Sequence, residues 1–213
     1  MVKVFFTRHA QTIRNIDGII QGNEHGDLSN KGAEQAKRLA KRIKKEKINN
    51  IVSSDSLRCK MTINEIINKN KCLVNYTTLL REKDNGDWIG KEIKKMRWDD
   101  LGDDFEKRKV PNGESLVEVR ERGRKFIKDL ISKYKNSNEK ILVVSHGAFL
   151  KILLGDLIGM NLKDSIFKLF IDHCSLTLVD FSDNYKEKCQ LKYLNETEFL
   201  GDSRNWMEMK NGE

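Results

Sequence analysis

Two histidines in this chain stand where short apolar runs of sequence end. Residues 2–6 have the length and composition of a buried strand, and Arg8 and His9 follow closely. Residues 141–145 form a second run of this kind, and His146 comes directly after it. Because ligands of open α/β sheets bind beyond the carboxyl ends of the strands, we expect both histidines at one site.

Arg58 lies in the first turn of a predicted helix, where a basic residue is unusual. A third short strand, residues 51–55, leads into that helix. The backbone dipole is positive at a helix N-terminus, so Arg58 is poorly placed there unless an anion binds. A phosphate group suits the helix end and the guanidinium together, because arginine's fork of donors matches phosphate oxygens.

The composition of the 213-residue chain predicts a single α/β domain of a soluble protein. Charged residues make up 34% of the chain and hydrophobic residues 38%, and no apolar run approaches the ~20 residues that span a bilayer. Strand-like sequence begins at residue 2 without a leader pattern, and the four cysteines show no C-x-x-C spacing. We therefore expect a cytoplasmic protein with free thiols.

The net charge of +8 arises from 40 basic and 32 acidic residues, much of it in mixed runs such as residues 41–47. Such runs are typical of a solvated helix face, whereas a nucleic-acid surface usually brings a recognisable motif or stacking aromatics. We expect no nucleic-acid partner and no membrane partner, and the charge excess favours small anions. The sequence leaves the oligomeric state open.

Hydrophobic periodicity predicts helices and strands in alternation, with one irregular segment between them. Residues 82–112 are rich in charge, glycine and tryptophan and are interpreted as an excursion over the site, with a short helix near residues 91–99. The polar tail from residue 201 is expected to be only partly ordered. The other predicted elements are helices after Ser29, over 57–68, from the Ser115–Glu118 capping box to Tyr134 and over 148–158, and strands at 72–76, 176–181 and 190–194.

The polar residues at these element ends resemble, in their order, the histidine phosphatase superfamily in its phosphoglycerate mutase-like branch. The resemblance covers the chain up to about residue 200 and implies a three-layer α/β sandwich, with a mostly parallel central sheet flanked by helices. Where the family usually has glycine after the Arg-His pair, this chain has Ala10. The motifs that carry the resemblance are Arg8-His9-x-x-Thr12-x-x-Asn15, Gln21-Gly22, Arg58, Glu82 followed by Gly86-x-Trp88-x-Gly90, Pro111-x-Gly113-Glu114-Ser115 and Ser145-His146-Gly147.

The resemblance implies that His9 is a nucleophile that forms a phosphohistidine. A neutral imidazole can attack phosphorus through one nitrogen while the other, still protonated, is held by an acceptor. Phosphoryl transfer then needs alignment and charge stabilisation, which Arg8, Arg58 and His146 would supply. The expected further phosphate or substrate contacts are Thr12, Asn15, Gln21 and Gly147.

Glu82 is the family's usual proton donor to the leaving oxygen and, later, the base that activates water. Asp84 or Asp87 is the alternative for this role, because both lie in the same charge-rich loop.

The two remaining histidines, His25 and His173, have polar neighbours and no partner motif, so we interpret them as ordinary histidines. A metal site built on His9 and His146 would need carboxylates that the sequence does not place beside them. We therefore expect no metal and no cofactor.

The predicted function is metal-independent hydrolysis of a small phosphorylated metabolite, with a phosphoglycerate mutase as the alternative. Mutases of this family follow the glutamate with arginine and a Tyr-Gly pair and have an adjacent arginine pair further along. Here residues 83–88 read Lys-Asp-Asn-Gly-Asp-Trp and residues 96–100 read Met-Arg-Trp-Asp-Asp. These carboxylates would repel a second phosphate if they faced the pocket. A non-catalytic phosphate-binding protein is less compatible, because His9 and Glu82 are both present.

Overall fold

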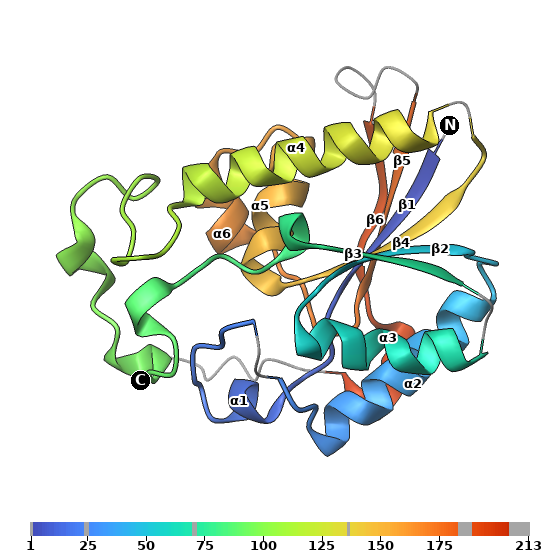
Figure 1. Cartoon of the computed structure of the whole chain (residues 1–213), viewed down its shortest axis with the longest axis horizontal. Helices are drawn as coiled ribbons and strands as arrows, with labels where there is room; N and C mark the ends of the chain where they lie inside the picture. The colour runs from blue at the N-terminus through green and yellow to red at the C-terminus, as the bar shows by residue number, and fades with distance from the viewer. Residues whose placement is uncertain (1, 24–25, 70–71, 136, 183–188, 205–213) are drawn as a thin grey trace.

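A computed structural model describes residues 2–23, 26–69, 72–135, 137–182 and 189–204. Within these residues, six strands form one sheet in the order β3-β2-β4-β1-β5-β6 (Figure 1). Their bounds are β1 Val2–Arg8, β2 Asn50–Ser54, β3 Leu73–Thr77, β4 Lys140–Ser145, β5 Leu176–Phe181 and β6 Cys189–Glu196. The four strands from β3 to β1 pair in parallel, and β5 and β6 are antiparallel to their neighbours. The prediction of a mostly parallel sheet is confirmed.

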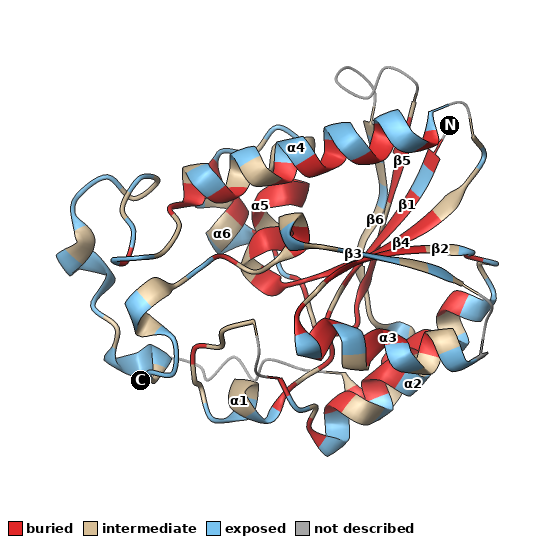
Figure 2. Ribbon diagram, viewed as in Figure 1, coloured by how far each residue is buried: buried red, intermediate tan, exposed pale blue. Residues whose placement is uncertain are grey.

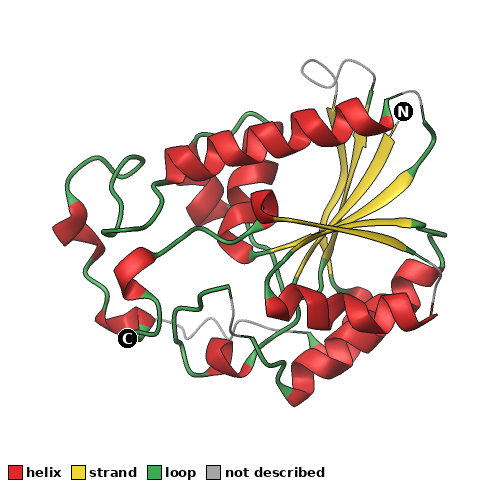
Figure 3. Ribbon diagram, viewed as in Figure 1, coloured by secondary structure: helices red, strands yellow, loops and turns green. Residues whose placement is uncertain are grey.

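Helices cover both faces of the sheet, so the three layers expected from the resemblance are present (Figures 1 and 3). Helices α4 (Leu116–Tyr134), α5 (Gly147–Leu157) and α6 (Leu162–Lys168) lie on one side, and α2 (Asn30–Lys44) and α3 (Leu57–Lys69) lie on the other. A four-residue helix, α1 (Ile13–Ile16), follows β1. Helices α2 and α4 begin at the predicted capping residues. Ser29 caps α2, and Ser115 forms a capping box with Glu118 at the start of α4.

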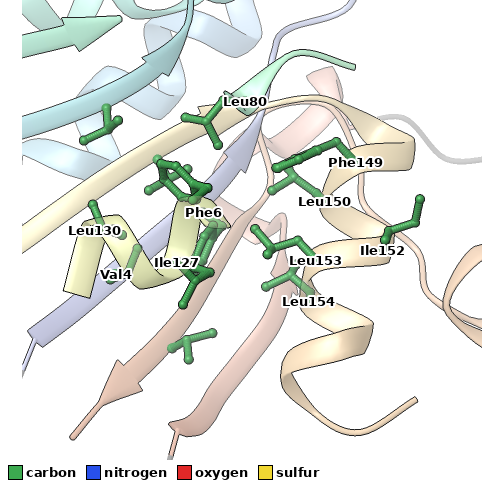
Figure 4. Packing of buried hydrophobic residues seen from close by; sticks show 14 of the residues in the cluster. Val4, Phe6, Leu80, Ile127, Leu130, Phe149, Leu150, Ile152, Leu153 and Leu154 are labelled. Carbon is green, nitrogen blue, oxygen red and sulfur yellow. The ribbon is translucent and has the colours of Figure 1, made fainter. Parts of the chain in front are cut away.

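The alternation of side chains along β1 divides the core into two clusters. Val4 and Phe6 pack under α4 and α5, where Figure 4 shows them facing Ile127 and Leu153, and Phe5 packs with the α2 and α3 side of the sheet. The central strands of the sheet are therefore buried on both faces and are red in Figure 2, whereas much of the edge strands β3 and β6 is intermediate or exposed. This burial explains why the sequences of β1 and β4 are nearly continuous apolar runs.

The segment between β3 and α4 is irregular, as the sequence predicted, and contains only short 3₁₀ helices among its described residues. These are η1 Thr78–Leu80, η2 Gly86–Trp88, η3 Ile93–Lys95 and η4 Trp98–Leu101. The single helix expected near residues 91–99 is thus replaced by η3 and η4, because too few apolar residues recur at helical spacing to bury a longer one. In Figure 1 the segment (green) extends past the α5 end of the sheet, and backbone hydrogen bonds from Ile20 to Lys91 and from Gly90 to Ile20 join it to the loop after β1.

The last described element is η5 (Glu198–Ser203), which packs on α2. The expectation of a partly ordered tail concerns mainly residues 205–213, which lie outside the described residues. Among the helices that the structure describes, none combines the length and apolar character needed to cross a membrane.

Candidate active site

The parallel strands β1 and β4 bring the two sequence-predicted histidines side by side. In their register Arg8 pairs with Ser145, and the amide of His9 donates to the Ser145 carbonyl at 2.9 Å. The rings of His9 and His146 follow directly, with centroids 5.2 Å apart and planes at 61°. Because β2 lies on the other side of β4, its end delivers the helix that contains Arg58 to the same place.

His9 is buried and is held as a neutral imidazole with a defined tautomer. Its Nδ1 lies 2.8 Å from the backbone carbonyl oxygen of Ala10, which can only accept a hydrogen bond, so Nδ1 carries the proton. Burial, followed by the positive charge of Arg58, holds the pKa of His9 well below 6.5. Nε2 therefore keeps its lone pair at neutral pH, which is the state that a nucleophile requires.

Arg58 is buried at the start of α3, with 2% of its surface exposed. Its Nη1 donates to the Gly22 carbonyl at 2.6 Å, and its Nε donates to Nδ1 of His146 at 3.2 Å. These bonds fix the direction of the guanidinium. Burial lowers the pKa of Arg58, and an arginine side chain keeps its charge in proteins. The charge that the sequence placed at this helix end is thus fixed beside both histidines.

Arg8 supplies a second guanidinium at the end of β1. Its Nη1 donates to the Ile171 carbonyl at 3.0 Å, whereas its Nε is buried and has no hydrogen-bond partner among the described residues. A Cβ atom at Gly147 would lie 3.1 Å from Cζ and 3.2 Å from Nε of Arg8, so a glycine at this position gives the guanidinium its room. An unpartnered buried donor of this kind is suited to bind an anion.

His146 contacts protein through both ring nitrogens. Nδ1 accepts from Arg58, so the proton is on Nε2, which lies 2.9 Å from Oγ of Ser54. Burial and then the charge of Arg58 lower its pKa well below 6.5, so this ring is also neutral. In this arrangement His146 orients Arg58, and the charge stabilisation expected of it is indirect.

Glu82 follows η1 in the chain, and its side chain reaches the N-terminus of α5. Its Oε2 accepts from the amide of Ala148 at 3.1 Å, and its Oε1 accepts from the amide of Phe149 at 2.9 Å. His146 is the N-cap of this helix but makes no side-chain capping bond, so the Glu82 carboxylate satisfies the amides instead. A carboxylate is thereby fixed next to the histidine and arginine cluster.

The backbone of Glu82 is held by Arg122, a residue that the sequence did not single out. Arg122 donates from Nη1 to the carbonyls of Leu79 and Arg81, and from Nη2 to the carbonyl of Glu82. Its Nε and Nη2 also form a bidentate pair with Glu114, at 2.9 and 2.7 Å. Glu114 belongs to the quoted Pro-x-Gly-Glu-Ser motif, which gives that motif a structural purpose.

Asp84 and Asp87, the alternatives to Glu82, are exposed and shape the loop. Asp84 accepts from the amide of Gly86 at 2.8 Å, and Asp87 accepts from the side chain of Asn112 at 3.0 Å. Neither of these contacts directs a carboxylate toward His9. This geometry favours Glu82 for acid and base chemistry.

Thr12, Asn15 and Gln21 form a polar cluster of their own. The Thr12 hydroxyl lies 2.8 Å from Oδ1 of Asn15 and 3.0 Å from Oε1 of Gln21, and Thr12 caps α1. Gln21 also lines a cavity of about 250 Å³ that reaches Glu82. The cluster thus orders the loop that carries Gly22, the acceptor for Arg58.

His173 lies in the site, contrary to our interpretation of it as an ordinary histidine. Its ring centroid is 5.2 Å from that of His9, and its Nδ1 lies 2.9 Å from the His9 carbonyl oxygen. Burial lowers its pKa well below 6.5, with the charge of Arg8 as the next cause. The available signal was its position just before β5, which pairs antiparallel with β1 and therefore starts where β1 ends. His25, the other histidine interpreted in this way, lies outside the described residues.

The cysteines add no second reactive centre to the described part of the chain. Cys59, Cys72, Cys174 and Cys189 are free, and burial raises the pKa of Cys59 to about 11, which makes its thiol unreactive. Among the described residues, no group of three or more His, Cys, Asp or Glu side chains is arranged to hold a metal ion.

The family model of the histidine phosphatase superfamily (branch 1) matches residues 4–197. The chain belongs to the histidine phosphatase superfamily. The recognition made from the motifs is thus confirmed, together with the expectation of an enzyme that acts on phosphate monoesters.

The relatives by sequence and by structure carry two kinds of name. A protein from Proteus mirabilis named "Probable phosphoglycerate mutase GpmB" is 30% identical over 190 residues, which cover 86% of this chain and 87% of that protein. The α-ribazole phosphatase structure from Shigella flexneri has a TM-score of 0.80 at 24% identity and covers 91% of this chain and 96% of its own. A phosphoserine phosphatase mutant from Entamoeba histolytica, in complex with phosphoserine, has a TM-score of 0.81 at 24% identity. That match covers 94% of this chain and 100% of the phosphatase chain. At these identities the structures establish the fold.

Proposed function

We propose that this protein hydrolyses phosphate monoesters through a covalent phosphohistidine on His9. The observation that carries the proposal is the state of His9, a buried neutral ring whose Nδ1 is held by the Ala10 carbonyl and which feels the charges of Arg58 and Arg8. Such a ring presents the Nε2 lone pair, and the fixed charges of Arg8 and Arg58 suit the equatorial oxygens of a transferring phosphoryl group.

The reaction then takes two steps. The Nε2 lone pair of His9 attacks phosphorus, the bond between phosphorus and the ester oxygen breaks, and protonated Glu82 gives its proton to the leaving oxygen. In the second step Glu82, now a carboxylate, takes a proton from water, whose oxygen attacks phosphorus while the P–N bond breaks. Neutral His9, protonated Glu82 and inorganic phosphate result, so the cycle closes without a metal ion or cofactor.

Hydrolysis is favoured over mutase transfer by the charges around Glu82. Lys83 is buried, and its Nζ lies 3.1 Å from Oδ1 of Asn85. Arg108 donates to Asp99 at 3.2 Å, and Asp84 is exposed at the edge of the loop. A mutase must retain a doubly phosphorylated intermediate, and cations that are already engaged by Asn85 and Asp99 are less available to hold it.

A direct comparison of products tests hydrolysis against the mutase alternative. The protein is incubated with 3-phosphoglycerate, with and without 2,3-bisphosphoglycerate, and both 2-phosphoglycerate and free phosphate are followed. Release of free phosphate without formation of 2-phosphoglycerate supports a phosphatase. If 3-phosphoglycerate does not react at all, hydrolysis of another phosphate monoester supports a phosphatase equally. Efficient isomerisation with little phosphate release would overturn the proposal.

The remaining sequence-based expectations also stay proposals. We propose that the whole chain acts as one domain with residues 82–112 over the site, and that it works in the cytoplasm. We likewise propose a small phosphorylated substrate as its ligand, without a nucleic-acid or membrane partner.

A further inference from the structure

A cavity of about 510 Å³ lies against Glu82, between the 82–112 segment and α6. Glu82 and Ala148, which are hydrogen-bonded to each other beside His146, belong to its lining. Large apolar side chains form most of the remaining wall, and four of them are Ile93, Trp98, Phe105 and Phe167.

The aromatic residues of this wall come from separate parts of the chain and meet with rings exposed. Phe105 and Phe167 have ring centroids 5.4 Å apart, and Trp98 packs edge-on against Trp88 at 4.7 Å. Phe167 is 67% exposed and Trp98 is 37% exposed. Exposed apolar side chains that converge on one concave surface mark a binding site. Contact between apolar surface and water is unfavourable, so a ligand that covers these side chains is bound with a gain in free energy.

The charged residues of the wall are already engaged. The ammonium of Lys83 lies 5.5 Å from the Trp98 ring and is bonded to Asn85, and the guanidinium of Arg108 lies 5.1 Å from the Phe105 ring and is paired with Asp99. A carboxylate on the substrate would have to compete with these partners. The cavity therefore suits an uncharged organic group better than an acidic one.

The position of Glu82 connects this cavity to the reaction. The leaving oxygen of a phosphate monoester is bonded to phosphorus on one side and to carbon on the other. A residue that protonates this oxygen must therefore stand where the phosphate pocket meets the pocket for the organic group. Glu82 meets this condition, because its carboxylate caps α5 beside His146 and the residue also lines the cavity.

We propose that this cavity binds the alcohol portion of the substrate, and that this portion is a flat, uncharged aromatic group. The proposal rests on the proposed phosphatase function and narrows its substrate class to phosphate monoesters of aromatic alcohols. An apolar cavity of about 150 Å³ is enough to bind benzene, so the volume here accommodates a group of two fused rings. The smaller cavity at Gln21 is lined mainly by polar side chains and suits water or a small polar group.

The test compares esters whose leaving alcohols have similar basicity. 2-(1-Naphthyl)ethyl phosphate is measured against ethyl phosphate and phosphoserine by phosphate release. We expect kcat/KM for the naphthyl ester to exceed that for ethyl phosphate by at least ~20-fold, the worth of burying about half of one aromatic group. Equal values, or a preference for phosphoserine, would overturn the proposal and leave the phosphatase function standing.

Variants of exposed residues locate the effect. Trp98→Ala and Phe167→Ala should each lower the ratio of naphthyl to ethyl kcat/KM by about 5- to 10-fold. Phe170→Ala is the matched control, because Phe170 is 41% exposed and lies just past α6 but is outside the cavity wall. Equal ratios in all three variants would contradict the assignment.

A binding measurement separates this proposal from the proposed function. If no ester is hydrolysed, the phosphatase function fails, and calorimetry with the non-hydrolysable 2-(1-naphthyl)ethylphosphonate and ethylphosphonate decides on the cavity. Tighter binding of the naphthyl compound that is weakened by Trp98→Ala supports the cavity assignment. Equal binding of both compounds overturns it.

Discussion

Replacing Arg122 by methionine should impair the acid and base role of Glu82 while the hydrogen bonds of the histidine cluster stay in place. Arg122 donates to the backbone of Leu79, Arg81 and Glu82 and pairs with Glu114. The guanidinium of Arg122 lies 4.9 Å from the centre of the Phe149 ring. Methionine keeps an apolar side chain over this ring but removes all of the hydrogen-bond donors. The change therefore releases the backbone that carries the Glu82 carboxylate.

The magnitude follows from what Arg122→Met leaves behind. Its side chain is 15% exposed and that of Glu114 is 26% exposed, so the pair is largely shielded. Removing one member of such a pair, with three carbonyls losing their donor, should lower the free energy of unfolding by about 3–5 kcal/mol. Loss of an aligned general acid should lower kcat/KM for alkyl phosphates by ~100-fold. p-Nitrophenyl phosphate, whose leaving group needs no proton, should lose much less in the phosphorylation step.

Arg124→Met is the control, because Arg124 is on the same helix and pairs with Asp156 and Glu121 at the surface. Urea unfolding should show a loss of about 1 kcal/mol or less for this variant, as for other exposed ion pairs. Steady-state and single-turnover kinetics on both kinds of ester complete the comparison. The reasoning is refuted if Arg122→Met behaves like Arg124→Met, or if it slows the phosphorylation of both ester types equally.

Three further outcomes are expected. Burial lowers the pKa of His9, His146 and His173 below 6.5, so the unfolded chain binds more protons as the pH falls. The free energy of unfolding should reach its full value above about pH 6.5. Below that pH it should fall by up to about 4 kcal/mol per pH unit, since three groups contribute. Equal free energies from urea unfolding at about pH 7.5 and about pH 5.5 would contradict this. Gly147→Ala should push the Arg8 guanidinium aside and raise the inhibition constant of inorganic phosphate about tenfold, and an unchanged constant would show that Arg8 does not bind phosphate. Activity should survive a chelator, and its loss followed by rescue with a divalent ion would overturn the metal-free scheme.

The fold and the centre of the site could be predicted because local sequence determines them. Apolar runs such as residues 141–145 read as strands on their own, and helices such as α4 begin with a capping box that needs no distant partner. Residues that follow neighbouring parallel strands must converge at one edge of the sheet. For this reason the positions of His9, His146 and Arg58 after three predicted strands were enough to place them in one site.

Other parts of the site depend on contacts that sequence spacing does not reveal. Arg122 looks like any basic residue on an exposed helix face, and its backbone partners lie about 40 residues earlier in the chain. His173 joins the site because β5 runs antiparallel beside β1, a pairing that the pattern of apolar residues did not specify. The 82–112 segment shows no hydrophobic period, and its residues 90–93 are held instead by backbone bonds to the loop after β1.

The central claim is that His9 carries the phosphoryl group. The most direct measurement uses Glu82→Gln with p-nitrophenyl phosphate, because this leaving group departs without a proton while hydrolysis of the phosphoenzyme loses its base. The reaction is quenched in alkali and the tryptic peptide of residues 9–14 is examined by mass spectrometry. We predict an acid-labile phosphate on His9 in nearly every molecule and none in the His9→Ala variant. A phosphate on another residue, or labelling that survives His9→Ala, would contradict this claim.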